Sequence, residues 1–431
     1  MKRPYWIGRR GFLLGSAALG VVLPAWAAPE AGGITGGRGG RIIRVTTLKA
    51  DGPGSFTEAV KAKGARIIVF EVGGVIDLGM ETVRINAGDV TIAGQTAPSL
   101  VTFVRGGIAI NADNVIVQHV AVRPGEAGQA KKSGWECDGI YAYGAAGVEV
   151  SNCSITWATD EGLSASGKRF GAEDTAASVA EWRAFTSHNI RFLRNIVAEG
   201  LSNATHSKGE HSKGTLIHDN VRDVVIADSL YAHNRERNVL FKGGAQGEMR
   251  GCVVYNAGKR FAHYNLHANE WAGHAFEAGD VRVRGNVFLG GPSSDAKAAA
   301  FMLGGDGALR LDINGNLALK ADGSAMEMTG RFGDGAPLLT LQAHAYVDRD
   351  AELRGHMGEV LATCGARPEM RAIPWMRGSW RMSATGRGGS SIARARSAGI
   401  RCGRRHGGRL WRARGIWCGW CGAECCTDCG R

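Results

Sequence analysis

The stretch "NVIVQHVAV" at residues 114–122 begins with a polar residue and continues with alternating β-branched residues. Such alternation predicts short β-strands. Related phrases recur as "GVEVSNCSI" from residue 147, "NIRFLRNIV" from 189, "DVVIADSLY" from 223, "DVRVRGNVF" from 280 and, more weakly, "EMRGCVVYN" from 248. Their starts lie roughly 25 to 42 residues apart, as expected for solenoid repeats with loops of variable length.

These repeats predict an all-β fold, a right-handed parallel β-helix that forms a single elongated domain over residues 33–335. Glycine is abundant, with 65 of 431 residues, and long amphipathic helices are scarce. A β-sandwich is the alternative, but it predicts hairpin turns such as Asn-Gly, which are few here. At one corner we expect side chains that hydrogen-bond the neighbouring coil's backbone, in a series of Asn152, Asn195, Asn286 and Asp228.

Two segments interrupt this pattern. Residues 52–78 begin with a short helix candidate, which can cap the open sheet edge at the end of the solenoid. Residues 167–188 separate two coils and indicate a loop with a helical turn. We assign residues 336–371 to a C-terminal extension.

The first 27 residues are typical of an export signal. They start with basic residues, continue with an apolar run and end in "AWA". The pair Arg9–Arg10 before "GFL" favours a twin-arginine signal, with an ordinary secretory signal as the alternative. We therefore expect a secreted or periplasmic bacterial protein. The apolar run is too short for a membrane span, and no other long run exists.

The formal net charge of +12 is concentrated at the two ends of the chain. Residues 1–27 hold four basic groups and no acid, and residues 371–431 hold 13 arginines and two acids. Residues 28–370 hold 35 basic and 38 acidic groups. The body is therefore slightly acidic, and the overall charge does not indicate a nucleic-acid partner.

Residues 372–431 are a low-complexity tail of Arg, Gly, Ser, Trp and Cys that cannot build a core. Read in another frame with GC-rich codons, residues 372–393 yield a balanced peptide, so we expect a frameshift near Arg371. A genuine basic tail is the alternative. The tail's "CGWC" and "CTDC" imitate zinc-ribbon spacing, and a frameshift would leave these cysteines without a function.

Charged residues form three clusters on successive coils: "ECDG" at 136–139, "TDEG" at 159–162, and "HSKGEHSKG" at 206–214 together with "RERNVLFK" at 235–242. Residues one coil apart lie side by side in a solenoid, so we expect these clusters to meet on one face. Carboxylates from neighbouring coils suit a hard cation such as Ca²⁺. The alternative is that the acids end strands in turns and the cations are solvated.

Three histidines, His206, His211 and His233, raise the question of a transition metal. We interpret them as polar loop and corner residues, because their spacing contains no tight H-x-x-H pair.

With "TIAGQTAP" at 91–98, the repeat and these clusters resemble the bacterial pectate lyases of polysaccharide lyase family one, over about residues 33–320. "RNVLFK" has the spacing of the family's R-x-P-x-x-R, which implies a catalytic Arg237, with Val239 for proline and Lys242 for the second arginine. The resemblance implies that Lys213 binds substrate. We add Lys242 and Arg235 to the substrate-binding residues, although Arg235 is also consistent with a surface ion pair.

The resemblance further implies that Glu136 and Asp138 form the first calcium-binding pair, an Asp-x-Asp in relatives. Asp160 matches a later ligand, and Glu161 assists it. The phrase "EVSN" stands where the family has W-I-D-H, so Ser151 replaces an aspartate and predicts a weaker calcium site.

The implied activity is calcium-assisted β-elimination on polygalacturonate by a monomeric enzyme. The proton on C5, next to the C6 carboxylate, leaves together with the C4 oxygen, and positive charge stabilises the enolate-like state. The family assigns the base to the arginine, so we expect an alkaline optimum. The alternatives are a β-helix glycoside hydrolase that uses Asp160 and Glu161, and a non-catalytic carbohydrate-binding β-helix.

Overall fold

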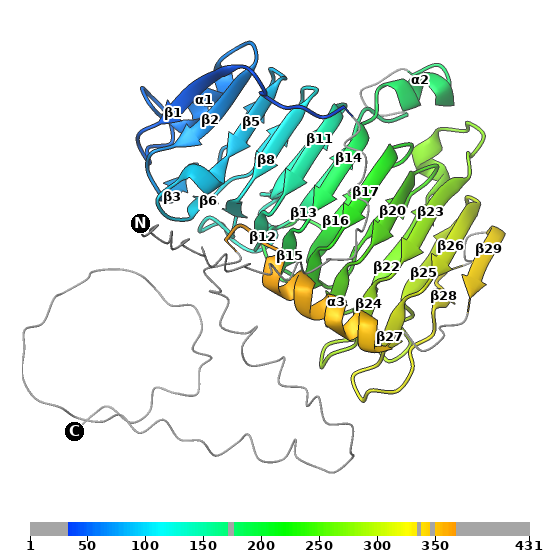
Figure 1. Cartoon of the computed structure of the whole chain (residues 1–431). Coiled ribbons are helices and arrows are strands. Elements are labelled where there is room, and N and C mark those ends of the chain that lie inside the picture. The colour runs from blue at the N-terminus through cyan, green and yellow to red at the C-terminus, as the bar shows by residue number, and fades with distance from the viewer. Residues whose placement is uncertain (1–32, 171–175, 334–337, 345–349, 368–431) are drawn as a thin grey trace, which may run out of the picture. The chain divides into compact units, whose positions relative to one another are not determined.

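The computed structural model describes residues 33–170, 176–333, 338–344 and 350–367. The predicted export signal, the position near Arg371 and the tail at 372–431 lie outside these residues. The described chain winds through three parallel sheets, here called sheets A, B and C. After the first strand, it passes from A to B to C and back to A, so each complete coil contributes one strand to each sheet (Figure 1). The prediction of a parallel β-helix is confirmed.

Sheet A has eleven strands and sheets B and C have nine each. In sheet order, sheet A consists of β1 (Arg41–Val45), β2 (Arg66–Phe70), β5 (Val90–Ala93), β8 (Val115–Gln118), β11 (Ala146–Ser151), β14 (His188–Leu193), β17 (Arg222–Ala227), β20 (Gln246–Arg250), β23 (Gly279–Arg284), β26 (Leu309–Asn314) and β29 (Leu338–His344). Sheet B consists of β3 (Gly74–Asp77), β6 (Val101–Val104), β9 (Val120–Arg123), β12 (Ser154–Thr156), β15 (Ile196–Ala198), β18 (Leu230–Ala232), β21 (Val253–Tyr255), β24 (Val287–Leu289) and β27 (Leu317–Leu319). Sheet C consists of β4 (Val83–Ile85), β7 (Ile108–Ile110), β10 (Ile140–Tyr143), β13 (Glu161–Ser166), β16 (Lys213–Ile217), β19 (Leu240–Lys242), β22 (Ala262–Leu266), β25 (Phe301–Gly305) and β28 (Thr329–Arg331).

The repeated phrases each cover a strand of sheet A, a tight corner and a strand of sheet B. One residue at each corner has a positive φ, for example 51° at Asn152 and 52° at Asp228. Asparagine and aspartate tolerate this left-handed conformation better than most residues. Their place in the repeat is therefore explained by the backbone turn.

The residue that follows this left-handed position forms the hydrogen-bonded ladder between coils. Asn195 Oδ1 accepts from the Cys153 backbone N–H at 2.8 Å, and its Nδ2 donates to the Val150 carbonyl. Asn286 makes the equivalent pair of bonds with Cys252 and Met249. The predicted ladder is thus confirmed for Asn195 and Asn286. It is wrong for Asn152 and Asp228, which stand one residue earlier, in the left-handed turn.

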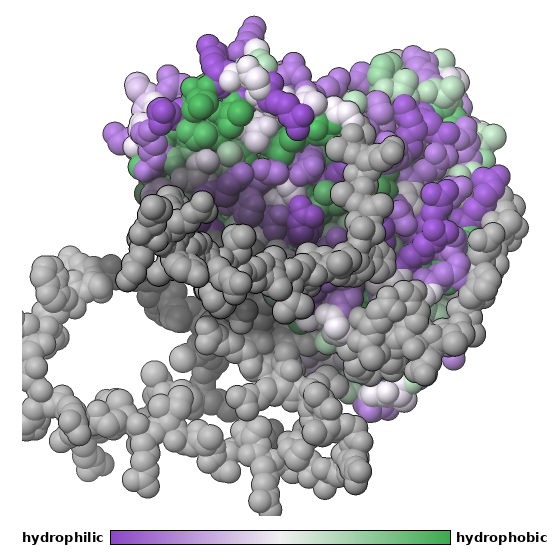
Figure 2. Space-filling view, viewed as in Figure 1, coloured by the Kyte–Doolittle hydropathy of each residue, from purple (hydrophilic) through white to green (hydrophobic). Residues whose placement is uncertain are grey.

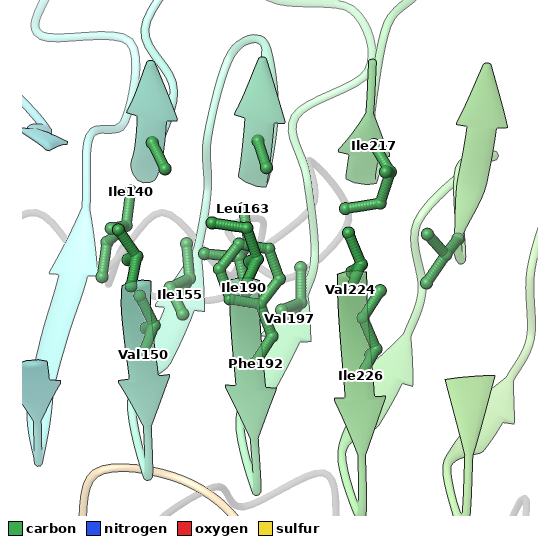
Figure 3. Packing of buried hydrophobic residues seen from close by; sticks show 14 of the residues in the cluster. Ile140, Val150, Ile155, Leu163, Ile190, Phe192, Val197, Ile217, Val224 and Ile226 are labelled. Atoms are coloured by element: carbon green, nitrogen blue, oxygen red, sulfur yellow. The ribbon is translucent and has the colours of Figure 1, made fainter. Parts of the chain in front are cut away.

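The core lies inside the coils, where side chains of successive coils stack on one another. Figure 3 shows Ile140 and Leu163 from sheet C directed at Val150 and Ile190 from sheet A, and Ile217 lies over Val224 on the next coil. All six are buried. Burial of each such side chain stabilises the fold by about 1.5–3 kcal/mol, and this row fixes the strand register that positions the site.

Helices cover the ends and corners of this core. In α1 (Phe56–Lys61), Ser55 caps the N-terminus and Phe56 packs on Phe103 with ring centroids 4.6 Å apart. The helix lies over the first coils, as predicted (Figure 1). The helical turn predicted within residues 167–188 is α2 (Val179–Ala184). Two 3₁₀ turns, η1 (Gly94–Thr96) and η2 (Ala268–Trp271), and the C-terminal α3 (Asp350–Thr363) complete the elements. The Asn152 side chain donates to the Thr363 carbonyl at 2.9 Å and so ties α3 to the coils.

Most of the coloured surface in Figure 2 is hydrophilic, with a hydrophobic patch over the first coils. Within the described part of the chain, no helix is both long and apolar enough to span a bilayer. The four cysteines of this part, Cys137, Cys153, Cys252 and Cys364, are buried free thiols, so Cys137 and Cys153 do not pair.

Candidate functional site

The candidate residues gather where strands of sheet C begin. Five successive coils each bring one of them to this edge: Asp138 before β10, Asp160 before β13, His211 before β16, Arg237 before β19 and Arg260 before β22. Neighbouring strands lie about 4.8 Å apart. The register aligns Glu161 with Lys213, and Lys213 with Glu236 on the next coil. The expectation that the charged clusters meet on one face is confirmed for these residues.

Three carboxylates form the centre of the site. Ligand oxygens of Asp138, Asp160 and Glu161 all lie within 4.8 Å of one another. Asp138 Oδ1 accepts from the Glu161 backbone N–H at 3.1 Å, and its Oδ2 accepts from Ser164 Oγ at 2.9 Å. Burial and the charge of Asp160 raise the pKa of Asp138 to about 8. Such crowding of negative charge fits a bound cation.

Arg237 is the cation nearest to this group. Its guanidinium donates to Glu161 Oε1, and its side chain is 25% exposed. Burial lowers the pKa of Arg237, while the charges of Asp160 and Asp138 oppose this shift. Arg237 has a left-handed φ of 65°, which a non-glycine residue adopts only when the surrounding structure holds it.

Lys213 is buried in an ion-paired chain that crosses three coils. Its Nζ donates to Glu236 Oε1, and Arg260 donates to the other oxygen of Glu236. Burial would raise the pKa of Glu236, but Lys213, His263 and Arg260 together lower it to about 2. Glu236 and Arg260 were missed in the sequence. The alignment of Glu236 with Lys213 would have required the strand register, although Glu236 lies within the charged stretch "RERNVLFK".

Lys242 lies at the opposite end of β19 from Arg237. Its Nζ pairs with Glu270 and is 3.3 Å from Asp219 Oδ2. Burial lowers its pKa to about 8, against the charge of Asp219. Trp271 Nε1 donates to Asp219 Oδ1 at 3.0 Å and helps to hold this buried group in place.

Arg235 lines a pocket of ≈ 660 Å³ beside the site and pairs with Glu210. Lys259, Ser293 and Asp295 also line the pocket, so its wall is polar. The pocket adjoins the site along the chain on three coils, because its lining residues Ser212, Arg235 and Lys259 come just before Lys213, Arg237 and Arg260.

Glu136 is exposed and lies outside the three-carboxylate group. Its Oε1 accepts from the backbone N–H of Ser207 at 3.1 Å and from Ser207 Oγ, and is 3.2 Å from His206 Nδ1. Burial would raise its pKa, but the bonds from Ser207 lower it overall.

His206 and His211 belong to the loop between β15 and β16, and this loop brings both rings to Asp160. His211 Nε2 is 2.6 Å from Asp160 Oδ1, and His206 Nε2 is 3.6 Å from the same oxygen. Burial would raise the pKa of Asp160, but the hydrogen bond with His211 and the nearby positive charges lower it. The spacing of the histidines in the sequence gave no sign of this meeting, because it depends on the course of the loop. His233 instead lines the pocket.

Ser151 is far from this edge in the coil. It ends β11 in sheet A, where its hydroxyl donates to Glu149 at 2.7 Å and accepts from Gln118 Nε2 at 3.3 Å. The prediction that Ser151 weakens a calcium site is therefore wrong, because the carboxylates lie at the start of sheet C.

No family model matches the chain. Among curated proteins, it is 34% identical over 267 residues to "Probable pectate lyase C" of Emericella nidulans, which covers 61% of this chain and 52% of the relative. The protein of the same name from Aspergillus terreus is 32% identical over 265 residues, covering 61% and 53%. The chain spans about half the length of the curated relatives it matches. These relatives are fungal and do not support the predicted bacterial origin.

Among solved structures, a pectate lyase from Bacillus sp. N165 in complex with trigalacturonate has 13% identity and a TM-score of 0.47, covering 78% of this chain and 96% of that one. Pectate lyase II from Xanthomonas campestris has 14% identity and a TM-score of 0.44, covering 79% and 98%. At these values the likeness carries no conclusion about activity. The chain is thus a parallel β-helix with sequence similarity to fungal proteins named pectate lyase C.

Proposed function

We propose that this protein is a polysaccharide lyase that cleaves polygalacturonate by β-elimination. The observation that supports this most is the row of charges at the start of sheet C: three carboxylates, with Arg237 and Lys213 on the following coils. An acidic polymer requires cations for binding, and elimination next to a carboxylate requires that its negative charge be balanced. The names of the curated relatives agree with this activity.

Asp138, Asp160 and Glu161 are the residues that would hold Ca²⁺. Their oxygens are the hard ligands that this ion prefers, and they already converge within 4.8 Å. When bound, the ion supplies positive charge that compensates a uronate carboxylate. Glu136 stays a proposed ligand, at the outer side of Asp160.

The chain's own residues position the sugar. Lys213, held by Glu236, presents a fixed positive charge to the uronate carboxylate. In this proposal Arg237 leaves Glu161, with which it is paired, and meets the C5 hydrogen when the substrate binds. The C5 proton passes to the base, its electron pair forms the C4–C5 double bond, and the C4–O bond breaks with protonation of the leaving oxygen.

Further along the polymer, Arg235 and Lys259 on the neighbouring pocket would bind additional uronate carboxylates. Lys242 remains a proposed substrate contact. Its charge is already balanced by Asp219 and Glu270, so we expect a smaller contribution from it than from Lys213. Export through residues 1–27 and a monomeric state belong to the same proposal.

A glycoside hydrolase is the second candidate, because Asp138, Asp160 and Glu161 bring several carboxylates together, and these enzymes act with a pair of carboxyl groups. Incubation with polygalacturonate distinguishes the two. Elimination produces an unsaturated product that absorbs ultraviolet light, and hydrolysis produces reducing ends without this absorbance. We expect absorbance that a chelator abolishes and Ca²⁺ restores. We expect Arg237→Ala to lose it, and Arg105→Ala, an exposed arginine on sheet B's side of the coil, to keep it. Reducing ends without absorbance would overturn the lyase proposal.

A further inference from the structure

We propose that Asp160, His206 and His211 form a binding site for a borderline transition-metal ion, with Zn²⁺ as the reference ion. The ligand atoms of these three residues lie within 4.8 Å of one another. The site shares Asp160 with the carboxylate group of the proposed function. It does not depend on lyase activity, because it rests on the donor set alone.

The distances in this group are close to those of a metal site. Zn–N and Zn–O bonds of about 2.0–2.1 Å in a tetrahedron place neighbouring ligand atoms about 3.3 Å apart. The Asp160 oxygen is 2.6 Å from His211 Nε2 and 3.6 Å from His206 Nε2. Both distances differ from this value by less than 1 Å.

The two imidazoles are buried against each other. Their rings stack with centroids 3.5 Å apart and an interplanar angle of 17°, and each Nε2 lies within 3.6 Å of Asp160 Oδ1. Because an imidazole nitrogen binds a metal in the plane of its ring, one of the stacked rings has to turn when both bind the same ion. His206 is 1% exposed and His211 is 5% exposed. Imidazole nitrogen selects Zn²⁺, Co²⁺ or Ni²⁺ over Ca²⁺.

Glu136 completes the arrangement from the outside. Its Oε1 is 3.2 Å from His206 Nδ1 and is fixed by two bonds from Ser207. The Lys208 backbone N–H also donates to Nδ1 at 3.1 Å, so Nδ1 accepts in this structure. When Nε2 binds a metal, the proton of the neutral ring moves to Nδ1, which gives up the bond from Lys208 and donates to Glu136 instead. A carboxylate behind a ligating histidine in this way orients the ring and strengthens the ligand, so Glu136 is a positioning residue of this site.

Cobalt provides a direct readout, because bound Co²⁺ has visible absorption bands. The full-length protein, made without a polyhistidine tag, is titrated with Co²⁺ after metal removal. We expect saturation at one ion per chain from this site, displacement by equimolar Zn²⁺ and no displacement by a hundredfold excess of Ca²⁺. The difference between wild type and His206→Ala/His211→Ala isolates this site from the cysteines at 402–429, which both proteins share.

Glu136→Gln tests the site at an exposed position that leaves the fold intact. We expect its Co²⁺ affinity to fall by about 10- to 100-fold. His188→Gln, on sheet A, serves as the matched histidine control and keeps wild-type affinity. A double variant that binds Co²⁺ like wild type, or Ca²⁺ that competes as well as Zn²⁺, overturns the inference.

The lyase proposal is tested separately on the same samples. Calcium-dependent cleavage with no Co²⁺ band overturns only the transition-metal site. A Co²⁺ band that depends on the histidines, in a protein without cleavage activity, supports the metal site and overturns the lyase proposal.

Discussion

Lys213 on one coil is ion-paired with Glu236 on the next, and Glu236 also binds Arg260 one coil further. One carboxylate thus compensates two cations that belong to different coils. The substrate-binding lysine of the proposed function is therefore part of the structural framework of the β-helix.

We expect Glu236→Gln to destabilise the protein by about 3–5 kcal/mol, because it leaves two partly buried cations without their shared carboxylate. Urea unfolding of wild type and variant measures the change. In the double variant Glu236→Gln/Lys213→Met, one of those cations is gone, and part of the loss should be recovered. A change below about 0.5 kcal/mol in the single variant would contradict this account.

Substitutions at the two corner positions should change stability differently, because one side chain bonds the neighbouring coil and the other only has to allow the left-handed turn. Asn195→Ala and Asn286→Ala each remove a buried side chain that makes two hydrogen bonds to the backbone of the preceding coil, and we expect losses of about 1–3 kcal/mol. Asp228→Gly, at a φ of 52°, should change stability by less than about 1 kcal/mol, since glycine adopts this conformation readily. Equal losses at both corner positions would refute the separate roles.

Acid should destabilise the protein through buried neutral histidines. Burial lowers the pKa of His218 to about 4 and that of His263 to about 3, against about 6.5 in the unfolded chain. Between these values the unfolded state binds more protons, so stability falls as the pH drops from 6.5 toward 4. We expect a loss on the order of 1–2 kcal/mol per histidine at pH 5. Urea unfolding at pH 7 and pH 5 measures it, and His218→Gln should show a smaller drop between the two.

Asp138→Asn tests the proposed calcium group with little disturbance of the fold. The asparagine oxygen still accepts from the Glu161 N–H, and its amide faces the Ser164 hydroxyl, which can accept. We expect the Ca²⁺ concentration for half-maximal cleavage to rise at least tenfold, because one charged ligand is lost. The free energy of unfolding of the variant should remain within about 1 kcal/mol of that of wild type. An unchanged Ca²⁺ requirement would exclude Asp138 from the ion's ligands.

The sequence predicted those features of the fold and of the site that follow from the repeat of short strands. Once the strands have a period, residues that precede them, such as Asp138, Asp160 and Arg237, must fall on the same edge. The repeat phrase does not show which of two adjacent corner residues turns the chain, and so Asn152 and Asn195 were treated alike. Ser151 was misplaced for a related reason: its position within the coil, in sheet A, was not considered.

Contacts made by loops were beyond such reasoning. His206 and His211 reach Asp160 because the residues between β15 and β16 fold back over the edge, and no local pattern encodes that path. Similarly, Arg260 meets Glu236 because two coils have nearly equal length there, which only the full register reveals.

Arg237 reaches Glu161 across the intervening strand β16, a separation of two strand spacings or about 10 Å. The distance between the strands that carry these two residues therefore changes only in whole strand spacings. Substitutions within a strand leave this distance unchanged, whereas the insertion of one complete coil between them would move the guanidinium out of reach of Glu161.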